Sequence, residues 1–435
     1  MDGAVGDLSS PRGSETRGRT RFTGYQRYLI VVLALVYTCH LIDRTMVMVL
    51  LEPIKEEFRL TDTQLGLFSG LIFSTGTFLA AAPLGALADR TSRKRLLAIC
   101  IAVWSSLTLL CGLSTTYVTL LLSRFGVGAG EGGLQPTALS ILGDETPPER
   151  RARAVALVHL GIPLGVVTGF LLGGSIAQSF GWRAALFIVG APGLLLAALV
   201  AFTVREPPRG SADPAASQAK IGLREFVRLV RADKALTHVI IGLVVLWFCT
   251  SSYSAWYATF LVRTHHLDVR TTGALMALVS GGGGFVGNLV SGALADRFAG
   301  KRMERLAAIA VVGALIYLPL GLLTMIIGDL WFLAPILFLQ NAVYFAVFTP
   351  GYSLALSLSD PRIRGRVFAT ITTAATLIGY GLGPQVVGLL SDIFKPWAGI
   401  DSLRYALMAA VLITLWTMIH FALAYRHLRG RTEQN

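Results

Sequence analysis

The sequence has few charged residues for its length. Asp, Glu, Lys and Arg make up 14% of its 435 residues, against about 25% in typical soluble proteins. Cysteine is also scarce, because there are only four, at positions 39, 100, 111 and 249, each inside an apolar stretch. Their placement excludes a disulfide framework and a Cys/His metal site. No G-x-x-x-x-G-K-[ST] phosphate loop occurs, which argues against an ATP-driven pump. We expect no cofactor, no metal and no enzyme activity.

Apolar residues and glycine are abundant instead. Residues of the set AVILMFWYC reach 54%, glycine occurs 46 times, and the mean hydropathy is +0.63. A membrane-spanning helix needs about 20 mostly apolar residues. Twelve stretches satisfy this: 27–50, 65–88, 96–113, 117–142, 152–178, 184–203, 236–262, 272–294, 305–326, 330–358, 366–391 and 403–424. The sequence therefore predicts an all-α membrane protein with twelve transmembrane helices.

The basic residues lie mostly on one side of the predicted spans. Of the 38 Lys and Arg residues, 29 fall in the tails and loops on the side of the N-terminus and seven on the opposite side. Cytoplasmic loops carry such an excess, so we expect both termini in the cytoplasm and the protein in the plasma (inner) membrane. The net charge of +13 then reflects topology and contact with anionic bilayer lipids rather than nucleic acid.

The chain also repeats itself. GALADRTSRKR at 85–95 returns as GALADRFAGKR at 292–302, identical at eight of eleven positions. Each copy follows the second span of a six-span half. We expect two pseudo-symmetric six-helix bundles at 23–204 and 235–427, with a linker at 205–234 that carries a basic amphipathic helix on the cytoplasmic surface. The tails, 1–22 and 428–435, should be cytoplasmic, the first of them disordered. Parallel repeats of this kind are typical of secondary transporters.

The paired loops resemble the signature loop of the major facilitator superfamily, and the resemblance extends over the whole chain. The first span at 40–44, the fourth at 124–133 and the eleventh at 381–384 are similar to the Spinster group. The resemblance implies the major facilitator fold, alternating access, and proton-linked or facilitative movement of lysolipids or sphingoid lipids such as sphingosine phosphate. A proton-coupled exporter of drugs or small organic anions is the alternative. A channel or receptor would not need two such loops.

Four charged residues lie well inside the predicted spans, and all are in the first half: Asp43, Arg44, Arg124 and Glu131. Charges in hydrocarbon are costly, so they indicate function. Arg124 and Glu131 are seven residues apart and share one helix face. We expect Asp43 and Glu131 to carry protons with His40 as a titrating partner, and Arg44 and Arg124 to bind an anionic headgroup. Asp43 is the preferred proton carrier, because Glu131 shares its face with Arg124. Alternatively, the charges form permanent salt bridges between spans one and four, and His40 is a spacer.

The second half contains no internal charge and offers aromatic and polar residues instead. We expect a set of these to line the cavity and bind the substrate: Trp247, Tyr253, Tyr257, Asn341, Tyr344 and Thr373. The alternative role is hydrogen bonding between helices. A charged half opposite an uncharged aromatic half suits an amphipathic small molecule or lipid.

The repeated loops predict a conformational latch at the cytoplasmic edge. Asp89 should face the N-terminus of span eleven and Asp296 that of span five, where a carboxylate is favoured by about 0.3–1 kcal/mol. The other expected members are Gly85, Arg90, Arg93, Arg95, Arg297 and Arg302. The alternative is that the loops only anchor topology by their positive charge. We expect a monomer whose partners are substrate, protons and bilayer lipids.

Overall fold

The computed structural model describes residues 21–209, 222–299 and 302–434, and these residues form helices without any strand. The tail before residue 21, and residues 210–221 of the linker, lie outside this part of the chain. The helices are α1 (Gly24–Phe58), α2 (Asp62–Gly66), η1 (Leu67–Leu71), α3 (Ile72–Arg90), α4 (Arg93–Gly112), α5 (Tyr117–Glu131), α6 (Leu134–Glu145), α7 (Pro148–His159), α8 (Gly161–Thr203), α9 (Leu223–Ala232), α10 (Lys234–His265), α11 (Val269–Met276), η2 (Ala277–Gly282), α12 (Gly283–Ala299), α13 (Met303–Ile326), α14 (Leu330–Leu358), α15 (Arg364–Ala374), η3 (Ala375–Leu382), α16 (Gly383–Ala398), η4 (Gly399–Asp401), α17 (Ser402–Leu412) and α18 (Thr414–Gln434).

These helices make twelve membrane crossings. Nine helical stretches of the described chain are long and apolar enough to cross a membrane, and two of them, Pro148–Thr203 and Arg364–Arg431, contain 56 and 68 residues. A helix of 56 residues would be about 84 Å long, far more than a bilayer of about 30 Å. Each therefore crosses twice, and the chain turns at Gly181 and Gly399, which have positive φ. The stretch α5–α6 adds one crossing, so the twelve predicted spans are confirmed.

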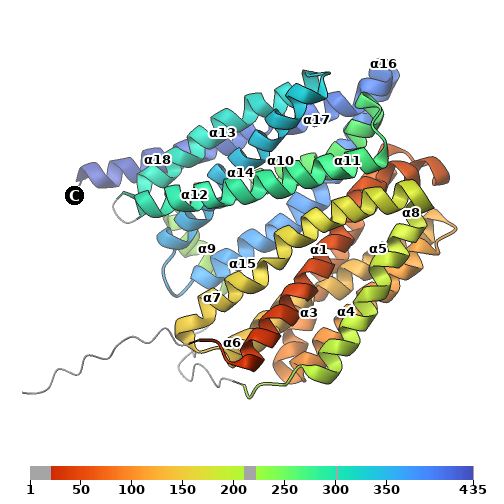
Figure 1. The fold of residues 1–435 in the computed structure, drawn as a ribbon. Helices are drawn as coiled ribbons and strands as arrows, with labels where there is room; N and C mark the ends of the chain where they lie inside the picture. The colour runs from red at the N-terminus through yellow and green to blue at the C-terminus, as the bar shows by residue number, and fades with distance from the viewer. Residues whose placement is uncertain (1–20, 210–221, 300–301, 435) are drawn as a thin grey trace, which may run out of the picture.

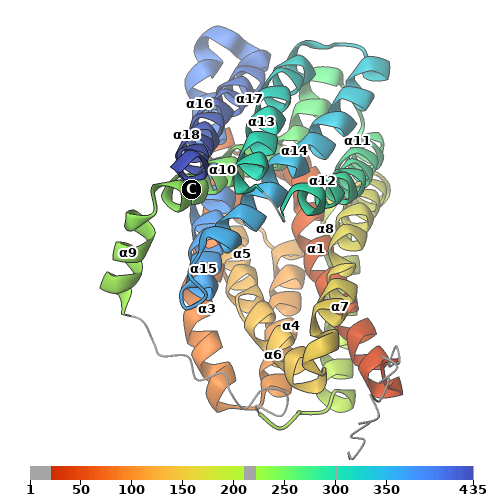
Figure 2. The ribbon, with the colours of Figure 1, turned by 90° about the vertical axis from the view of Figure 1, so that its left-hand side faces the viewer.

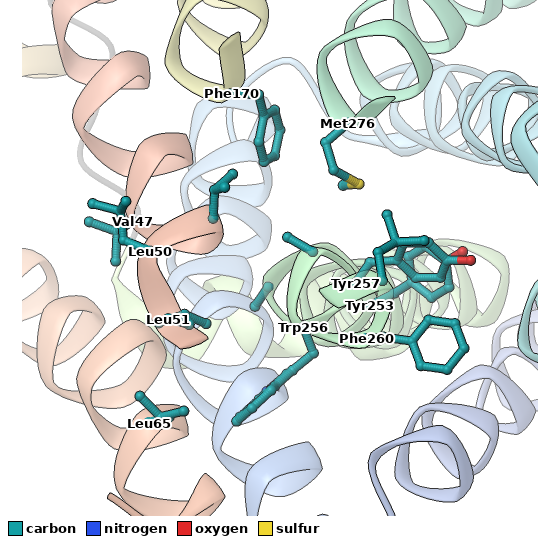
Figure 3. Close-up of a cluster of buried hydrophobic side chains, with 14 of the residues drawn as sticks. Val47, Leu50, Leu51, Leu65, Phe170, Tyr253, Trp256, Tyr257, Phe260 and Met276 are labelled. Atoms are coloured by element: carbon teal, nitrogen blue, oxygen red, sulfur yellow. The ribbon is translucent and has the colours of Figure 1, made fainter. Parts of the chain in front are cut away.

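The crossings form two bundles around separate cores. One cluster of buried apolar side chains draws only on the first half, from Leu29 to Val204, and a second draws only on residues from Phe226 onwards. A third cluster, which we call the joint cluster, combines both halves. Figure 3 shows Val47 and Leu50 of α1 in this cluster, together with Phe170 of α8 and Trp256 of α10.

The joint cluster closes one end of the molecule. In Figure 1 the two bundles converge near the labels of α8 and α16 and diverge toward α7 and α12. The ends of α1, α10 and α16 and the start of α2 lie at the converging end, which we call the sealed end. Both described chain termini lie at the opposite end, the tail end, where α9 projects beside the bundles (Figure 2). On α9, Phe226 packs into the second half while Leu223 is exposed.

The helices at the boundary between the bundles are locally irregular. Spans two, eight and eleven contain the π-helical segments η1, η2 and η3, and span five is interrupted at Leu160. Glycine allows close approach here: a Cβ on Gly70 would lie 2.8 Å from the carbonyl oxygen of Gly381. Segments of this kind inside α-helices often occur at functional sites.

Candidate functional site

A cavity of about 900 Å³ lies between the bundles. Both halves contribute to its wall, through α1 and α7–α8 on one side and α10, η2–α12, α13, α14 and η3 on the other. Seven of the residues predicted from the sequence line it: His40, Arg44, Trp247, Tyr253, Tyr257, Asn341 and Tyr344. Asp43, Arg124 and Glu131 are buried outside this lining, and Thr373 is exposed on α15.

Asp43 is held by two donors. The Thr108 hydroxyl donates to its Oδ1 at 2.8 Å, and Arg124 donates to its Oδ2 at 3.2 Å. Asp43 and Arg124 are only 2% and 3% exposed, so this is a buried ion pair between spans one and four. The sequence favoured Asp43 as the proton carrier on the ground that Arg124 shares a face with Glu131. The structure instead pairs Arg124 with Asp43.

Glu131 has a different environment. Its Oε2 lies 3.0 Å from Nδ1 of His40, but the two groups lack hydrogen-bond alignment, and neither oxygen of Glu131 has another hydrogen-bond partner in the described chain. Glu131 is 5% exposed, whereas His40 also lines the cavity. A buried carboxylate with so little support is costly in its charged form. His40 therefore lies next to Glu131 and also forms part of the cavity wall.

Arg44 lies between aromatic rings. Its guanidinium carbon is 3.8 Å from the ring centroid of Tyr380 and 5.1 Å from that of Phe73, while the guanidinium of Arg124 lies 4.5 Å from Phe73. Within the described residues, no carboxylate forms an ion pair with Arg44. Ring faces attract the cation without neutralising its charge. Arg44 thus brings an uncompensated positive charge to the cavity wall.

The second half supplies aromatic and polar side chains to the cavity wall, and most of their polar groups form hydrogen bonds within the protein. Tyr253 donates to Oε1 of Gln340 at 2.7 Å, and Tyr257 donates to the carbonyl of Thr324 at 3.2 Å. The two tyrosine rings stack with centroids 4.5 Å apart. Figure 3 shows both side chains on α10. Asn341 donates to the carbonyl of Leu337. Tyr253 and Tyr257 therefore both line the cavity and join helices, whereas the hydrogen bond of Asn341 stays within α14.

Sequence reasoning missed an ionic network at the sealed end. Arg263 of α10 donates to both oxygens of Asp62, each at 2.8 Å, and to Glu52 of α1. Lys55 adds a contact to Asp62 at 2.6 Å, and Ser391 donates to it at 2.7 Å. This network joins the two halves. In the sequence these residues are only charges near the ends of spans. They help to predict topology, but nothing in the sequence indicates that they contact one another.

In the part of the chain that the structure describes, the two latch carboxylates do not join the halves at the tail end. Asp89 and Asp296 are exposed, and in the described structure neither forms a hydrogen bond or an ion pair. Arg93 is buried within the first half, where it binds Asp144 and Glu206. The remaining latch residues lie at or near the helix ends beside the two loops: a Cβ at Gly85 would meet open space, Arg302 lies 4.0 Å from Glu304, and Arg90, Arg95 and Arg297 are exposed.

Two six-helix bundles around a central cavity, sealed at one end, define an alternating-access membrane transporter. The sequence model of the Major Facilitator Superfamily matches residues 33–384, and the chain belongs to this superfamily. It is a transporter and not an enzyme.

Comparison with known proteins also confirms the resemblance to Spinster. The chain is 28% identical over 428 residues to the sphingosine-1-phosphate transporter SPNS2 of Danio rerio, covering 90% of this chain and 82% of that protein. It is 32% identical over 380 residues to an MFS-type efflux pump of Mycolicibacterium smegmatis, covering 87% and 88%. A bacterial homologue of the human lysosomal transporter Spinster, solved inward-facing and unoccupied, superposes with a TM-score of 0.83 at 27% identity, covering 94% and 99%.

Proposed function

We propose that the protein is a proton-coupled transporter of an anionic amphipathic molecule, such as a lysolipid or a sphingoid phosphate. The observation that carries this proposal is Arg44, which lines the cavity without a carboxylate partner. A planar guanidinium suits a phosphate headgroup. The apolar part of the substrate would pack against Trp247, Tyr253, Tyr257 and Tyr344. This division agrees with sphingosine 1-phosphate, the substrate for which the related SPNS2 protein is named.

In this proposal the proton site is Glu131, reached from the cavity through His40. Asp43 and Arg124 hold spans one and four together in the present arrangement, and both become available if their ion pair opens in another state. Proton uptake by Glu131 would remove the cost of a buried charge and so depend on which side the cavity faces. Asn341 and Thr373 would serve the substrate path, Thr373 closer to the tail end.

We also assign the tail end to the cytoplasm and the protein to the plasma membrane, with both termini inside. The excess of basic residues on that side supports this orientation. The present arrangement would then be inward-facing, as in the solved Spinster homologue. The loops of Asp89 and Asp296 would form their latch only after the cavity closes to the cytoplasm.

A second candidate function is the export of drugs or small organic anions. The efflux pump that is 32% identical over most of the chain favours it. In that case the same cavity would accept compounds mainly by their apolar surface.

Ligand binding to the unmodified protein in nanodiscs distinguishes the two. We expect a single-chain lipid phosphate to bind more tightly than the corresponding alcohol, and inorganic phosphate to bind weakly. Arg44→Gln should reduce affinity for the lipid phosphate about tenfold or more, the effect of losing a charge-assisted hydrogen bond. Arg59→Gln, at an exposed position of the sealed end, is the control. Equal binding of phosphate and alcohol would contradict an anion site and favour the exporter.

A further inference from the structure

We propose that Asp392 of span eleven caps the N-terminus of span two at the sealed end, and that this cap alternates with the latch expected from Asp89 at the tail end. Span two runs from Asp62 to Arg90 as α2, η1 and α3, and span eleven runs from Arg364 to Ala398 as α15, η3 and α16. Asp392 is thus a positioning residue for the alternation itself. The inference does not depend on the identity of the substrate or on proton coupling.

The contact at the sealed end is complete. The carboxylate of Asp392 accepts from the backbone N–H of Asp62 at 3.1 Å and from that of Thr63 at 2.7 Å, and also from the Thr63 hydroxyl at 2.6 Å. Thr61 accepts from the next N–H, that of Gln64. The first N–H groups of a helix have no partner within the helix. Span two therefore obtains two of its cap hydrogen bonds from the other half of the molecule.

The tail end has a matching helix N-terminus and carboxylate, but there the two are not in contact. The helix α15 begins without a side-chain cap, and Asp89, in the last turn of α3, is exposed. The separation from Asp62 to Asp89 is 27 residues, equal to that from Gly365, the second residue of α15, to Asp392. Each span therefore carries a carboxylate at the same distance along the helix from its own start. Because the two spans run in opposite directions, the carboxylate of each span lies at the end of the molecule where the other span starts.

The spans touch closely between these ends. A Cβ on Gly70 of η1 would lie 2.8 Å from the carbonyl of Gly381 and 2.9 Å from that of Tyr380, both in η3. Bulky side chains are thus excluded from the crossing, and it can act as a pivot. A tilt about it that brings Asp89 to α15 moves Asp392 away from α2. Only one cap can then be closed at a time.

The pseudo-symmetric pair, spans five and eight, lacks this arrangement. The N-terminus of α11 is capped by Asp268, which belongs to the same half and accepts from the N–H of Thr271 at 2.9 Å. A cap inside one half is unaffected by relative tilting. Asp268 therefore offers a matched control, because it performs the same chemistry without crossing the boundary.

Distances between pairs of spin labels on the full chain, measured by double electron–electron resonance, test the proposal. Spin labels at exposed Glu56 and Lys395 report the sealed end, and labels at exposed Leu87 and Thr370 report the tail end. All labelled variants are made in a protein whose four native cysteines have been replaced, so that only the introduced cysteines carry a label. Asp392→Ala should raise the ratio of molecules open at the sealed end to molecules open at the tail end about fivefold, the equilibrium effect of losing one helix cap. Asp89→Ala should lower that ratio, and the double variant should return toward the unmodified protein.

The proposal is supported if Asp268→Ala leaves the ratio unchanged. Asp392→Asn keeps the side-chain volume and one acceptor oxygen, so it should shift the ratio in the same direction by a smaller amount. This second variant remains informative if the alanine variant fails to fold. Equal distance distributions in the Asp392 and Asp268 variants, or Asp89→Ala and Asp392→Ala shifting in the same direction, would overturn the alternation of the cap with the latch.

Discussion

The two buried acids of the first half differ in what holds them. Asp43 has an arginine and a hydroxyl as partners, whereas Glu131 has one histidine at 3.0 Å without hydrogen-bond alignment. Removing one partner of a buried ion pair leaves the other charge uncompensated and costs about 3–5 kcal/mol. Substitutions at the two acids should therefore have separable consequences for stability and for transport.

We expect Glu131→Gln to abolish uptake driven by a pH gradient while the protein keeps its thermal stability, because Glu131 has no strong partner to lose. Asp43→Asn should instead lower the stability by about 3 kcal/mol, since the buried Arg124 loses its counter-charge. Uptake into proteoliposomes and thermal unfolding in detergent measure the two effects. Full proton dependence of transport in Glu131→Gln would contradict the assignment of Glu131 as the proton site.

The sequence predicts which charged residues lie inside the spans, but not which of them pair with each other. The charges could be identified because ionisable residues are rare in apolar spans. Whether Arg124 binds Glu131 or Asp43 depends on the rotation of span four against span one, which helical spacing within one span does not define. Tyr380 and Phe73, which flank Arg44, were missed, because an aromatic residue in an apolar span is ordinary.

Among the elements, the start of the linker is fixed to the first half by Glu206. Burial alone would raise the pKa of this carboxyl group, but the N–H of Lys94, the hydroxyl of Ser92 and the guanidinium of Arg93 together lower it. The hydrogen bonds to Glu206 from these groups are 2.7–2.9 Å long. The linker thereby holds the first turn of α4, next to the loop of Asp89.

The lowered pKa of Glu206 predicts a pH-dependent contribution to stability. The contribution is fully present above the unfolded value, about 4.3, and is lost as the pH falls through the lower folded value. Glu206→Gln should therefore lower the melting temperature between pH 5 and 7, and the difference from the unmodified protein should shrink below about pH 4. Glu149→Gln, at an exposed position, is the control. A difference that grows on acidification would contradict this role of Glu206.

All twelve spans could be placed from hydropathy, since each is a long apolar run. The π-helical segments could not, because they arise where glycine-rich stretches of opposite bundles meet, as Gly66 and Gly70 meet Pro384 and Gly381. For η1 and η3 that information lies in contacts between residues more than 300 positions apart in the sequence. The role of Asp392 could not be predicted for the same reason, because its contact with α2 also joins residues far apart in the sequence.

For the whole molecule, the decisive property is that the halves share one apolar cluster at one end only. The sequence could not predict which end is sealed, because a transporter that alternates must encode both arrangements. A Cβ on Gly66 would lie 2.7 Å from the carbonyl oxygen of Pro384 across the boundary, whereas one on Gly292 would meet no atom within 4 Å. The two glycines therefore differ in whether they restrict the sealed arrangement.

We expect Gly66→Ala to disfavour the sealed arrangement and to lengthen the distance between spin labels at Glu56 and Lys395. Gly292→Ala should leave this distance unchanged, although both substitutions add the same methyl group to a helix. Electron–electron distance measurements in nanodiscs check both variants. An unchanged distance in Gly66→Ala would show that the crossing tolerates a larger residue, and the close approach would then not control sealing.

The unequal division of charge between the halves bears on how such a protein could change its cargo. A duplicated ancestor would have begun with two equivalent halves, yet here the Asp, Glu and Arg residues well inside the spans lie in one copy and most of the aromatic cavity wall in the other. Substitutions in α10 or α14 reshape the space offered to a ligand without touching Glu131 or Asp43. Selection for a new compound can therefore act on one copy while the proposed proton site in the other remains unchanged.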